Sequence, residues 1–515
     1  MPRQWQLGVV ETRPNTYFRT ESGDVVAEGA INGIVAVVYK GTWGEALKVV
    51  DISPEDMNNL QNIVGTGAGY DAIKQAFIGG AQLVRAVRVG VAPTTTTTNA
   101  DGTKTTTSVN KPRKTLYTTV TTKDASGKTV TTTPKAMAIY SKCHTGRTLT
   151  VSVTTNLFNK KRQLTIYDGT RIVETFSVVA GSKESIRMVD AINAQSRWFT
   201  AKHLYKNANG KTVGVKLNDY NAAAFSAGKD LTTSVGAFAD GIEALEPYTW
   251  NTIIATTKSQ AVQLALTNFV IQSYEVGRFG MAVIGGSANT TLEDHMALAA
   301  SINDWRVVYC PSGWVGNDGK NYGIYTLAGR IAGMIAGCET NASITHLVIS
   351  GAFDLLNNYT NGEYIQAEEN GCLMLSKNDA GQVWIDNSIN ALVTPGNGLD
   401  EGWKKIRRTK TRFELMTRVN RTCDKLIGRL NNDANGRATI ITAMTTIIRE
   451  MIAEGKLFEG SYATEDTRYT PVGDRAYFLL VIGDIDSMEK IYLTFRFSYA
   501  NPFADQDVAT TATLA

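Results

Sequence analysis

The pattern of apolar positions predicts an α/β domain near the start of the chain. Residues 30–38 are almost all apolar, which is typical of a strand buried on both faces of a sheet. Ser53 and Pro54 fit the N-cap and first position of a helix. A second helix is predicted around residues 69–79, and the apolar run 82–89 predicts another strand. Alternating strands and helices favour an α/β fold.

The pattern changes at Pro93, where a threonine-rich stretch begins and continues to Thr133. Threonine favours strands but buries little apolar surface, so we expect a solvated linker or an exposed β-ribbon. Short alternating strands follow between residues 136 and 179, and Asp168-Gly169 predicts a hairpin turn between two of them. We interpret residues 93–180 as a linker and a β-sandwich domain inserted into the α/β domain.

The strand-helix alternation resumes after the insertion. Strands are predicted at 252–256, 280–284 and 307–310, and helices at 258–276, 291–304 and 322–336. A sheet covered by helices on both faces satisfies this order. We therefore expect residues 30–92 and 181–400 to form one α/β core.

The last hundred residues predict an α+β domain over residues 401–499, followed by a polar tail at 500–515. Apolar residues recur at helical spacing in two segments up to Met451, and strands are predicted at 476–482 and 491–499. One face of the last strand carries Ile491, Leu493, Phe495 and Phe497. The first 29 residues predict an extended arm with strand character at Trp5, Leu7 and Val9.

Charge and composition exclude several classes of protein. The 515 residues contain 52 basic and 48 acidic side chains, so a net charge of +4 gives no general attraction to nucleic acid or anionic membrane. The five cysteines show neither a disulfide framework nor zinc-ligand spacing. No signal peptide and no membrane-spanning stretch is recognisable, so folding in the cytoplasm without membrane insertion is expected.

Motifs for catalysis are weak throughout the sequence. No P-loop, GxSxG elbow or HExxH motif occurs, and Gly65-Thr-Gly67-Ala-Gly69 lacks dinucleotide-loop spacing. The four histidines stand apart from one another. We therefore expect no enzyme activity, cofactor or metal. Two alternatives stay open: a cytoplasmic hydrolase with a Ser-His-Asp triad assembled from distant positions, and a filament or surface-layer protein of another kind.

One local charge feature precedes the first C-terminal helix, whose start should prefer negative charge. It is a basic segment formed by Lys404, Lys405, Arg407, Arg408, Lys410 and Arg412. This segment is either a solvated basic face or a docking patch for an acidic partner surface. Nucleic acid is disfavoured because no aromatic residues are interleaved with the charges.

The C-terminal third resembles the contractile phage tail sheath proteins, especially those of phages of Gram-positive bacteria. The resemblance rests on Arg408-Thr-Lys-Thr-Arg412, on residues 428–437 and 482–492, and upstream on the small-residue helix 327–336 followed by 341–345. Arg13-Pro-Asn-Thr-Tyr17 keeps only the proline and tyrosine of the usual N-terminal motif. The order of these motifs supports the resemblance, which covers most of residues 13–92 and 248–499 and less of the segment between them.

The resemblance implies a structural subunit rather than an enzyme. Sheath subunits form stacked six-fold rings around a tail tube, contract to drive that tube through the host envelope, and are attached to baseplate and tail terminator proteins. Their core is likened to a subtilisin-type arrangement without the triad, and arms at both termini donate strands to neighbouring subunits. This implies that Trp5, Leu7, Val9, Ile491, Leu493, Phe495 and Phe497 lie in donated strands, and that the protein is located in the virion tail. We further expect the basic segment 404–412 to face the tube.

Overall fold

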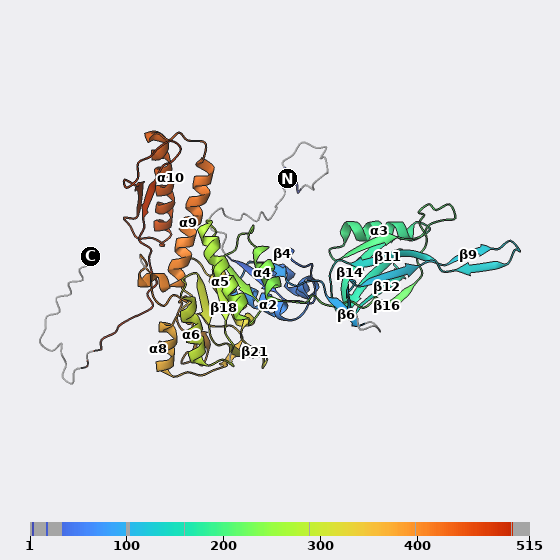
Figure 1. The fold of residues 1–515 in the computed structure, drawn as a ribbon, viewed down its shortest axis with the longest axis horizontal. Helices are drawn as coiled ribbons and strands as arrows, with labels where there is room; N and C mark the ends of the chain where they lie inside the picture. Colours follow the sequence, from blue (N-terminus) through green and yellow to red (C-terminus); the bar gives the residue numbers. More distant parts are fainter. Residues whose placement is uncertain are drawn as a thin grey trace.

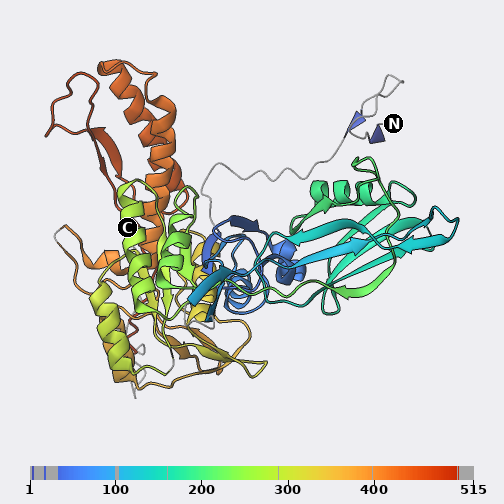
Figure 2. The ribbon, with the colours of Figure 1, turned by 45° about the vertical axis from the view of Figure 1, so that its right-hand side comes forward.

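The computed structural model describes residues 3–4, 17–18, 33–98, 104–158, 160–287, 289–396, 398–495 and 497. Over these residues the chain forms an elongated molecule with a central α/β core, an insertion on one side and a C-terminal domain on the other (Figure 1). The same division is visible after rotation, with helices α9 and α10 projecting from the core (Figure 2). The predicted mixed α/β fold is confirmed.

The core is built on one six-stranded sheet with the order β19-β18-β17-β3-β5-β4. Its strands are parallel except β4, which pairs antiparallel with β5 at the edge. The strands are β3 (Ile34–Tyr39), β4 (Val49–Ile52), β5 (Leu83–Arg88), β17 (Thr252–Ala255), β18 (Met281–Gly285) and β19 (Val307–Cys310). All six residues of β3 are buried, as expected for a central strand covered on both faces.

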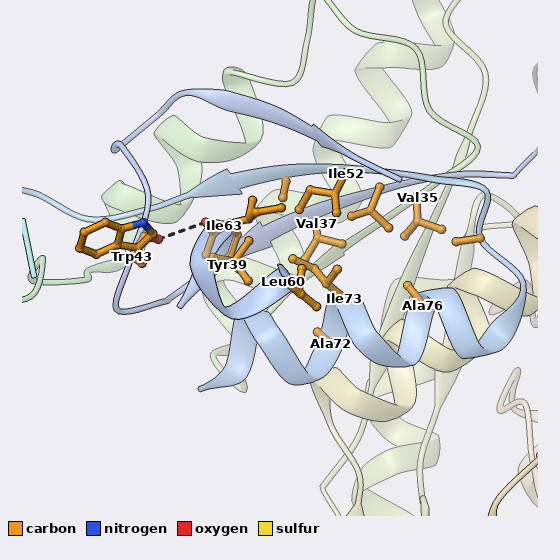
Figure 3. Close-up of a cluster of buried hydrophobic side chains, with 14 of the residues drawn as sticks. Val35, Val37, Tyr39, Trp43, Ile52, Leu60, Ile63, Ala72, Ile73 and Ala76 are labelled. Atoms are coloured by element: carbon orange, nitrogen blue, oxygen red, sulfur yellow. Dashed lines mark hydrogen bonds between the residues drawn. The ribbon is translucent and has the colours of Figure 1, made fainter. Parts of the chain in front are cut away.

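Helices cover both faces of this sheet. Val35 and Val37 of β3 face α2 (Ala68–Gly79) and α7 (Tyr325–Gly337), and Figure 3 shows the same side chains above Ala72 and Ile73. The alternate residues of β3 pack with the helices of the opposite face, α4 (Val235–Glu243) and α5 (Gln260–Glu275). Strand alternation thus sends successive side chains into two separate apolar layers.

Shorter elements complete the core. They are η1 (Pro54–Asn59), α1 (Leu60–Val64), α6 (Leu292–Ile302), β20 (Trp314–Gly316), β21 (Asn321–Tyr322), β22 (Ala352–Leu355), α8 (Asn361–Glu369), β23 (Leu375–Lys377), β24 (Val383–Ile385) and η2 (Glu401–Lys404). In the glycine-rich segment 65–69, Gly69 allows α2 to pack closely on β3. A Cβ at Gly69 would collide with the ring of Tyr39, so close helix-strand contact explains that glycine without a nucleotide.

Over the described residues, the body of the insertion is built from a three-stranded sheet, a four-stranded sheet and helix α3. One sheet consists of β8 (Arg113–Tyr117), β11 (Lys135–Ser141) and β15 (Phe199–His203). The other has the order β14-β13-β12-β16, with strands β12 (Leu149–Thr155), β13 (Lys161–Asp168), β14 (Arg171–Val179) and β16 (Tyr220–Ala224). Helix α3 (Glu184–Gln195) buries Met188, Val189 and Ile192 against them. The predicted turn at Asp168-Gly169 joins β13 to β14, and Gly169 has a positive φ of 61°.

The expected end of the insertion at residue 180 is too early. Strands β15 and β16 lie beyond residue 180, yet they pair with β11 and β12 of the inserted sheets. The two connections to the core meet where Val91 and Thr232 exchange backbone hydrogen bonds of 2.9 and 3.0 Å. We therefore place the insertion between these two residues.

The threonine-rich stretch forms two β-ribbons over its described residues. Strand β6 (Thr94–Thr98) pairs with β7 (Lys104–Ser108), and β9 (Val120–Lys123) pairs with β10 (Thr129–Thr132). The second ribbon projects from the far end of the insertion (Figure 1). All four residues of β10 are exposed, because threonine supplies strand propensity without apolar surface to bury.

Helices α2 and α7 cross closely because small residues meet at every fourth position. A Cβ at Gly329, Gly333 or Gly337 of α7 would collide with the carbonyl oxygens of Ala72, Ala76 and Gly80, respectively. Gly333→Ala should therefore lower stability by about 1–3 kcal/mol, measured by thermal or chemical unfolding. Gly362→Ala in α8, where a Cβ meets nothing within 4 Å, should be neutral or slightly stabilising. Equal effects of the two substitutions would contradict the close-packing argument.

The C-terminal domain consists of α9 (Ile406–Leu426), α10 (Ala434–Ala453) and a two-stranded sheet of β25 (Tyr462–Glu465) and β26 (Phe478–Val481). Its core is small and includes Leu415, Met444, Ile448 and Met451. The predicted helices and the strand at 476–482 are found here. The short pair β1 (Arg3–Gln4) and β2 (Tyr17–Phe18) is parallel, and Trp5, Leu7 and Val9 lie outside the described residues.

Candidate functional site at the C-terminal arm

The chain that leaves β26 is held against the start of α9 by a group of ion pairs, here called the anchor. Its cations are Lys405, Arg407, Arg408 and Arg412, and its acidic residues are Asp484 and Glu489. Arg408 and Arg412 are four residues apart, so one helical face presents both guanidinium groups to Asp484. The acidic side chains thereby offset the positive charge at a helix start that would otherwise be unfavourable.

Asp484 is the centre of the anchor. It accepts two hydrogen bonds from Arg408, at 2.9 Å from Nε and 2.6 Å from Nη2, and its Oδ2 lies 2.9 Å from Nε of Arg412. Burial alone would raise the pKa of Asp484, but the hydrogen bond from Arg408 and the charge of Arg412 outweigh it and lower the pKa. Arg412 also lies over the ring of Trp403, 3.8 Å from its centroid.

A second set of contacts holds the chain up to Glu489. The Nζ of Lys405 binds this carboxylate and donates to Oδ1 of Asn387 at 2.9 Å. The hydroxyls of Ser343 and Thr345 donate to Glu489 Oε1 at 2.7 and 2.9 Å. Arg407, which is buried, donates to the backbone carbonyl oxygens of Asn341 and Ile485. The anchor therefore joins α9, the core and the departing chain.

Beyond the anchor the chain runs out with its large apolar side chains in solvent. We call residues 491–495 and 497 the arm segment. The exposed fractions are 68% for Ile491, 88% for Tyr492, 72% for Leu493, 74% for Phe495 and 92% for Phe497. Residues 491–495 form no strand with any described residue. Such a run of exposed apolar side chains marks an interaction surface.

The two-stranded sheet of the C-terminal domain lies next to the anchor and packs one face against α10. Among the described strands, β25 pairs only with β26, so each has one edge without a partner strand. The chain continues from β26 directly to Asp484, and Ile485 N donates to Lys456 O at 3.1 Å. A two-stranded sheet is marginal in water unless further strands or a helix support it. Open edges of this kind accept an added strand.

The structure places the basic segment 404–412 against partners within the chain. Lys404 binds Glu401 at 2.8 Å, and Lys410 donates to the carbonyl oxygen of Cys338 at 2.6 Å. The other four cations belong to the anchor. Burial lowers the pKa of Lys410 to about 8. The basic segment is therefore not simply a solvated basic face. Its contact with a tube stays a prediction.

The sequence reasoning missed the acidic half of the anchor. Asp484, Asp486 and Glu489 follow the strand at 476–482 as a short acidic run, which could have been matched to the basic segment. Trp403, one residue before the basic segment, was missed as the surface on which Arg412 stacks.

The histidines do not form a catalytic triad in the described part of the chain. His203 Nε2 lies 2.9 Å from Ser185 Oγ, but Ser185 is fully buried and no described carboxylate hydrogen-bonds to this histidine. His295 is a buried core residue between Tyr309 and Ser287, and His346 stacks on Trp384. Within the described residues no cluster of ligands fits a metal ion, and no helix is long and apolar enough to span a membrane.

The comparisons with known proteins point to one family. The family model for the phage tail sheath protein central domain matches residues 205–391. Residues 205–391 are thus similar to the central domain of phage tail sheath proteins. This part contains three of the six strands of the core sheet, β17, β18 and β19, together with helix α7, so the resemblance read from the sequence is confirmed. No curated protein matches the chain in sequence.

Solved sheath structures resemble the fold of most of the chain. The sheath tail protein of Desulfitobacterium hafniense is 16% identical, with a TM-score of 0.61 over 92% of this chain and 100% of that one. The sheath tail protein Lin1278 of Listeria innocua is 15% identical, with a TM-score of 0.61 over 88% and 94%. The contracted helical sheath of the anti-feeding prophage is 10% identical, with a TM-score of 0.51 over 95% and 100%. At these identities the likeness shows a common fold.

The matched segment 205–391 contributes an ionisable group next to the anchor, Glu368 of α8. Its Oε2 accepts from Asn387 at 2.9 Å, and Asn387 in turn accepts from Lys405. Burial, together with a hydrogen bond and the charge of Asp386, raises the pKa of Glu368 to about 7 against the lowering effect of Asn387 and Lys405.

Glu368 should make the stability of the α/β core depend on pH. Between the unfolded pKa, about 4.3, and the folded value the native state binds more protons than the unfolded state. The stability contribution is therefore full below about pH 4.3 and is lost as the pH rises through about 7. Glu368→Gln should remove this slope when thermal midpoints are compared from pH 4.5 to 7.5. Glu369→Gln, at the exposed neighbouring position, should leave it unchanged.

Proposed function

We propose that the chain is the structural subunit of a contractile tail sheath, which polymerises helically around a tail tube and contracts to drive the tube through the host cell envelope. The observation that carries this proposal is the arm segment, which exposes its apolar side chains immediately after a firmly held anchor. The sheath central domain and the shared fold of known sheath proteins support it.

The proposed link between subunits is strand donation. The arm segment of one copy would pair with an open edge of the β25–β26 sheet of a neighbour, where its main-chain groups gain hydrogen-bond partners. Alternate side chains would then cover the partly buried Phe478 and Leu480 of the small core. A head-to-tail contact of this kind is heterologous and propagates as a helix. The N-terminal arm, with Trp5, Leu7 and Val9, is proposed to donate in the same way.

The anchor attaches the start of the donated strand firmly to its own subunit. Because Asp484 and Glu489 bind the core and α9, tension on a donated strand would pass directly into the body of the subunit. Core domains can then repack from an extended to a contracted lattice while the strand links persist. The extended lattice would be a kinetically trapped state of higher free energy, so that contraction needs no nucleotide.

Partners and location follow from this proposal. The subunits would assemble as stacked six-fold rings in a virion tail, around a tube protein and between baseplate and terminator proteins, after folding in the host cytoplasm. The insertion extends away from the C-terminal domain (Figure 1), which supports its placement on the outer surface of the sheath. We also propose that those cations of the basic segment that do not belong to the anchor face the tube.

Negative-stain electron microscopy of the purified full-length chain tests the proposal. Hollow striated cylinders are the expected result. A compact monomer that turns over a substrate would instead favour a hydrolase, and flat arrays would favour a surface-layer protein. The Ser185–His203 pair gives no support to the hydrolase, because the Ser185 side chain is fully buried.

A further inference from the structure

A cavity of about 400 Å³ lies between helix α9 and the core, and none of the anchor residues lines it. One wall comes from α9, and the other from residues 248–251 and 276–279, which lead into β17 and β18. Asn420 of α9 and Gly277 stand at its exposed rim, where a Cβ at Gly277 would lie 3.4 Å from Asn420 Nδ2. The cavity therefore has the size of a site for a small organic molecule.

The inner wall of the cavity is aromatic. Trp250, Phe279 and Phe413 line it, and the side chains of Trp250 and Phe413 are buried. Phe279 and Phe413 stack with their ring centroids 5.7 Å apart, and Trp250 stacks on Phe269 at 5.8 Å. These contacts hold the rings in place before any ligand arrives. A pre-formed aromatic wall favours a ligand with a flat apolar body.

Cationic side chains of α9 line the same cavity. The Nζ of Lys410 donates to the carbonyl oxygens of Cys338 and Glu339 at 2.6 and 3.2 Å, which leaves one of its three donors unused. The Nε of Arg418 is buried and has no hydrogen-bond partner among the described residues. Arg421 forms no ion pair within the part of the chain that the structure describes. Hydrogen-bond donors on positively charged groups are thus available to a ligand.

The acidic residues of the lining leave this positive charge incompletely balanced. Glu414 accepts two hydrogen bonds from the Nζ of Lys456, at 2.8 and 3.0 Å. Asp424 is exposed and forms no ion pair with Arg421. Burial lowers the pKa of Lys410 to about 8 against the opposing effect of Glu414, because the charged amine lacks a sufficient counterion. The lining therefore favours a ligand that brings negative charge.

We propose that this cavity is a binding site for a small amphipathic anion, which is an aromatic or aliphatic body carrying one carboxylate or sulfonate group. The apolar body would lie against Trp250 and Phe413, while the acid group would accept from Lys410, Arg418 and Arg421. A bound molecule would hold α9 against the core. The cavity is complete within one chain, so binding depends neither on assembly nor on the proposed sheath function.

Titration of the full-length chain with anilinonaphthalene sulfonate, an aromatic sulfonate, tests this proposal. Calorimetry and dye fluorescence should show one molecule bound per chain under native conditions. Phenylnaphthylamine, which has the same rings without the sulfonate, should bind at least about tenfold more weakly, because it cannot accept hydrogen bonds from the cations. Equal binding of the two dyes, or no binding of either, would overturn the proposal.

Matched variants locate the dye in the cavity. Arg421→Gln should weaken binding of the sulfonate about tenfold, and Asn420→Trp, which places a large ring at the rim, should block it. Arg429→Gln removes an exposed arginine just beyond α9 and should leave binding unchanged. Leu493→Ser with Phe495→Ser should also leave it unchanged, since the dye would not lie on the arm segment. Thermal unfolding checks that each variant is folded.

Two results with these variants would contradict the proposal. Dye binding that neither Arg421→Gln nor Asn420→Trp alters would place the dye elsewhere on the chain. If Asn420→Trp instead prevented tube formation while dye binding stayed unchanged, the cavity would take a side chain of a second copy and not a small molecule.

Discussion

Leu493→Ser combined with Phe495→Ser should prevent the purified chain from forming tubes while leaving the monomer folded. Both side chains are more than 70% exposed in the single chain, so their removal costs the fold little. In a donated strand both would be buried on one face, at about 1.5–3 kcal/mol each. The concentration needed for assembly should therefore rise at least about 100-fold, as measured by sedimentation and electron microscopy.

A substitution on the opposite strand face provides the control for this result. Tyr492 is 88% exposed and lies between the two substituted positions, so in a strand its side chain points the other way. Tyr492→Ser should change the assembly concentration much less. If both variants assembled equally well, or equally badly, the arm segment would not act as a strand buried on one face.

Asp484→Asn should destabilise the C-terminal domain and release the chain that follows β26. The substitution leaves Arg408 and Arg412, both largely buried, without their carboxylate. Breaking a buried ion pair from one side costs about 3–5 kcal/mol; solvent still reaches both arginines, so we expect about 2–3 kcal/mol. Hydrogen exchange should speed up over residues 482–490 more than over α10.

Asp466→Asn is a matched control for Asp484→Asn. Asp466 also receives two hydrogen bonds from the guanidinium group of one arginine, Arg468, in the same domain, but the side chain of Arg468 is 66% exposed, against 8% for Asp466. This pair should contribute little, as is usual for exposed ion pairs. In a double-mutant cycle, Asp484→Asn and Arg408→Met together should lower the free energy of unfolding by less than the sum of their separate effects. Additive losses would show that the two residues do not stabilise the domain through each other.

Asp484→Asn, compared with Arg408→Glu, separates the two roles proposed for the basic segment, which are anchoring within the chain and contact with the tube. If Arg408 and Arg412 act only through the anchor, Asp484→Asn and Arg408→Glu should both weaken assembly, with or without tube protein. If they also contact an acidic tube, Asp484→Asn frees two cations and should preserve or increase binding to the tube, whereas Arg408→Glu should reduce it.

Local pattern was enough to predict most elements of the core. The apolar strand at residues 30–38 and the helices after Lys258 and Tyr322 follow from alternation and helical spacing, which depend only on near neighbours. The extent of the insertion was not predictable in this way. Its end is defined by the pairing of Val91 with Thr232, and residues so far apart in sequence meet only because two sheets close between them.

For the candidate site, too, some features follow from the sequence alone and others only from the tertiary structure. The sequence by itself determined that residues 404–412 are basic and that residues 491–497 carry alternating apolar side chains, because both are properties of short segments. Only the tertiary structure decided that the basic side chains bind Asp484 and Glu489 within the same chain, leaving the arm segment exposed beyond them. The physical reason is that a charged side chain can pair with any opposite charge the fold brings within about 4 Å, and folding over more than 70 residues selects that partner.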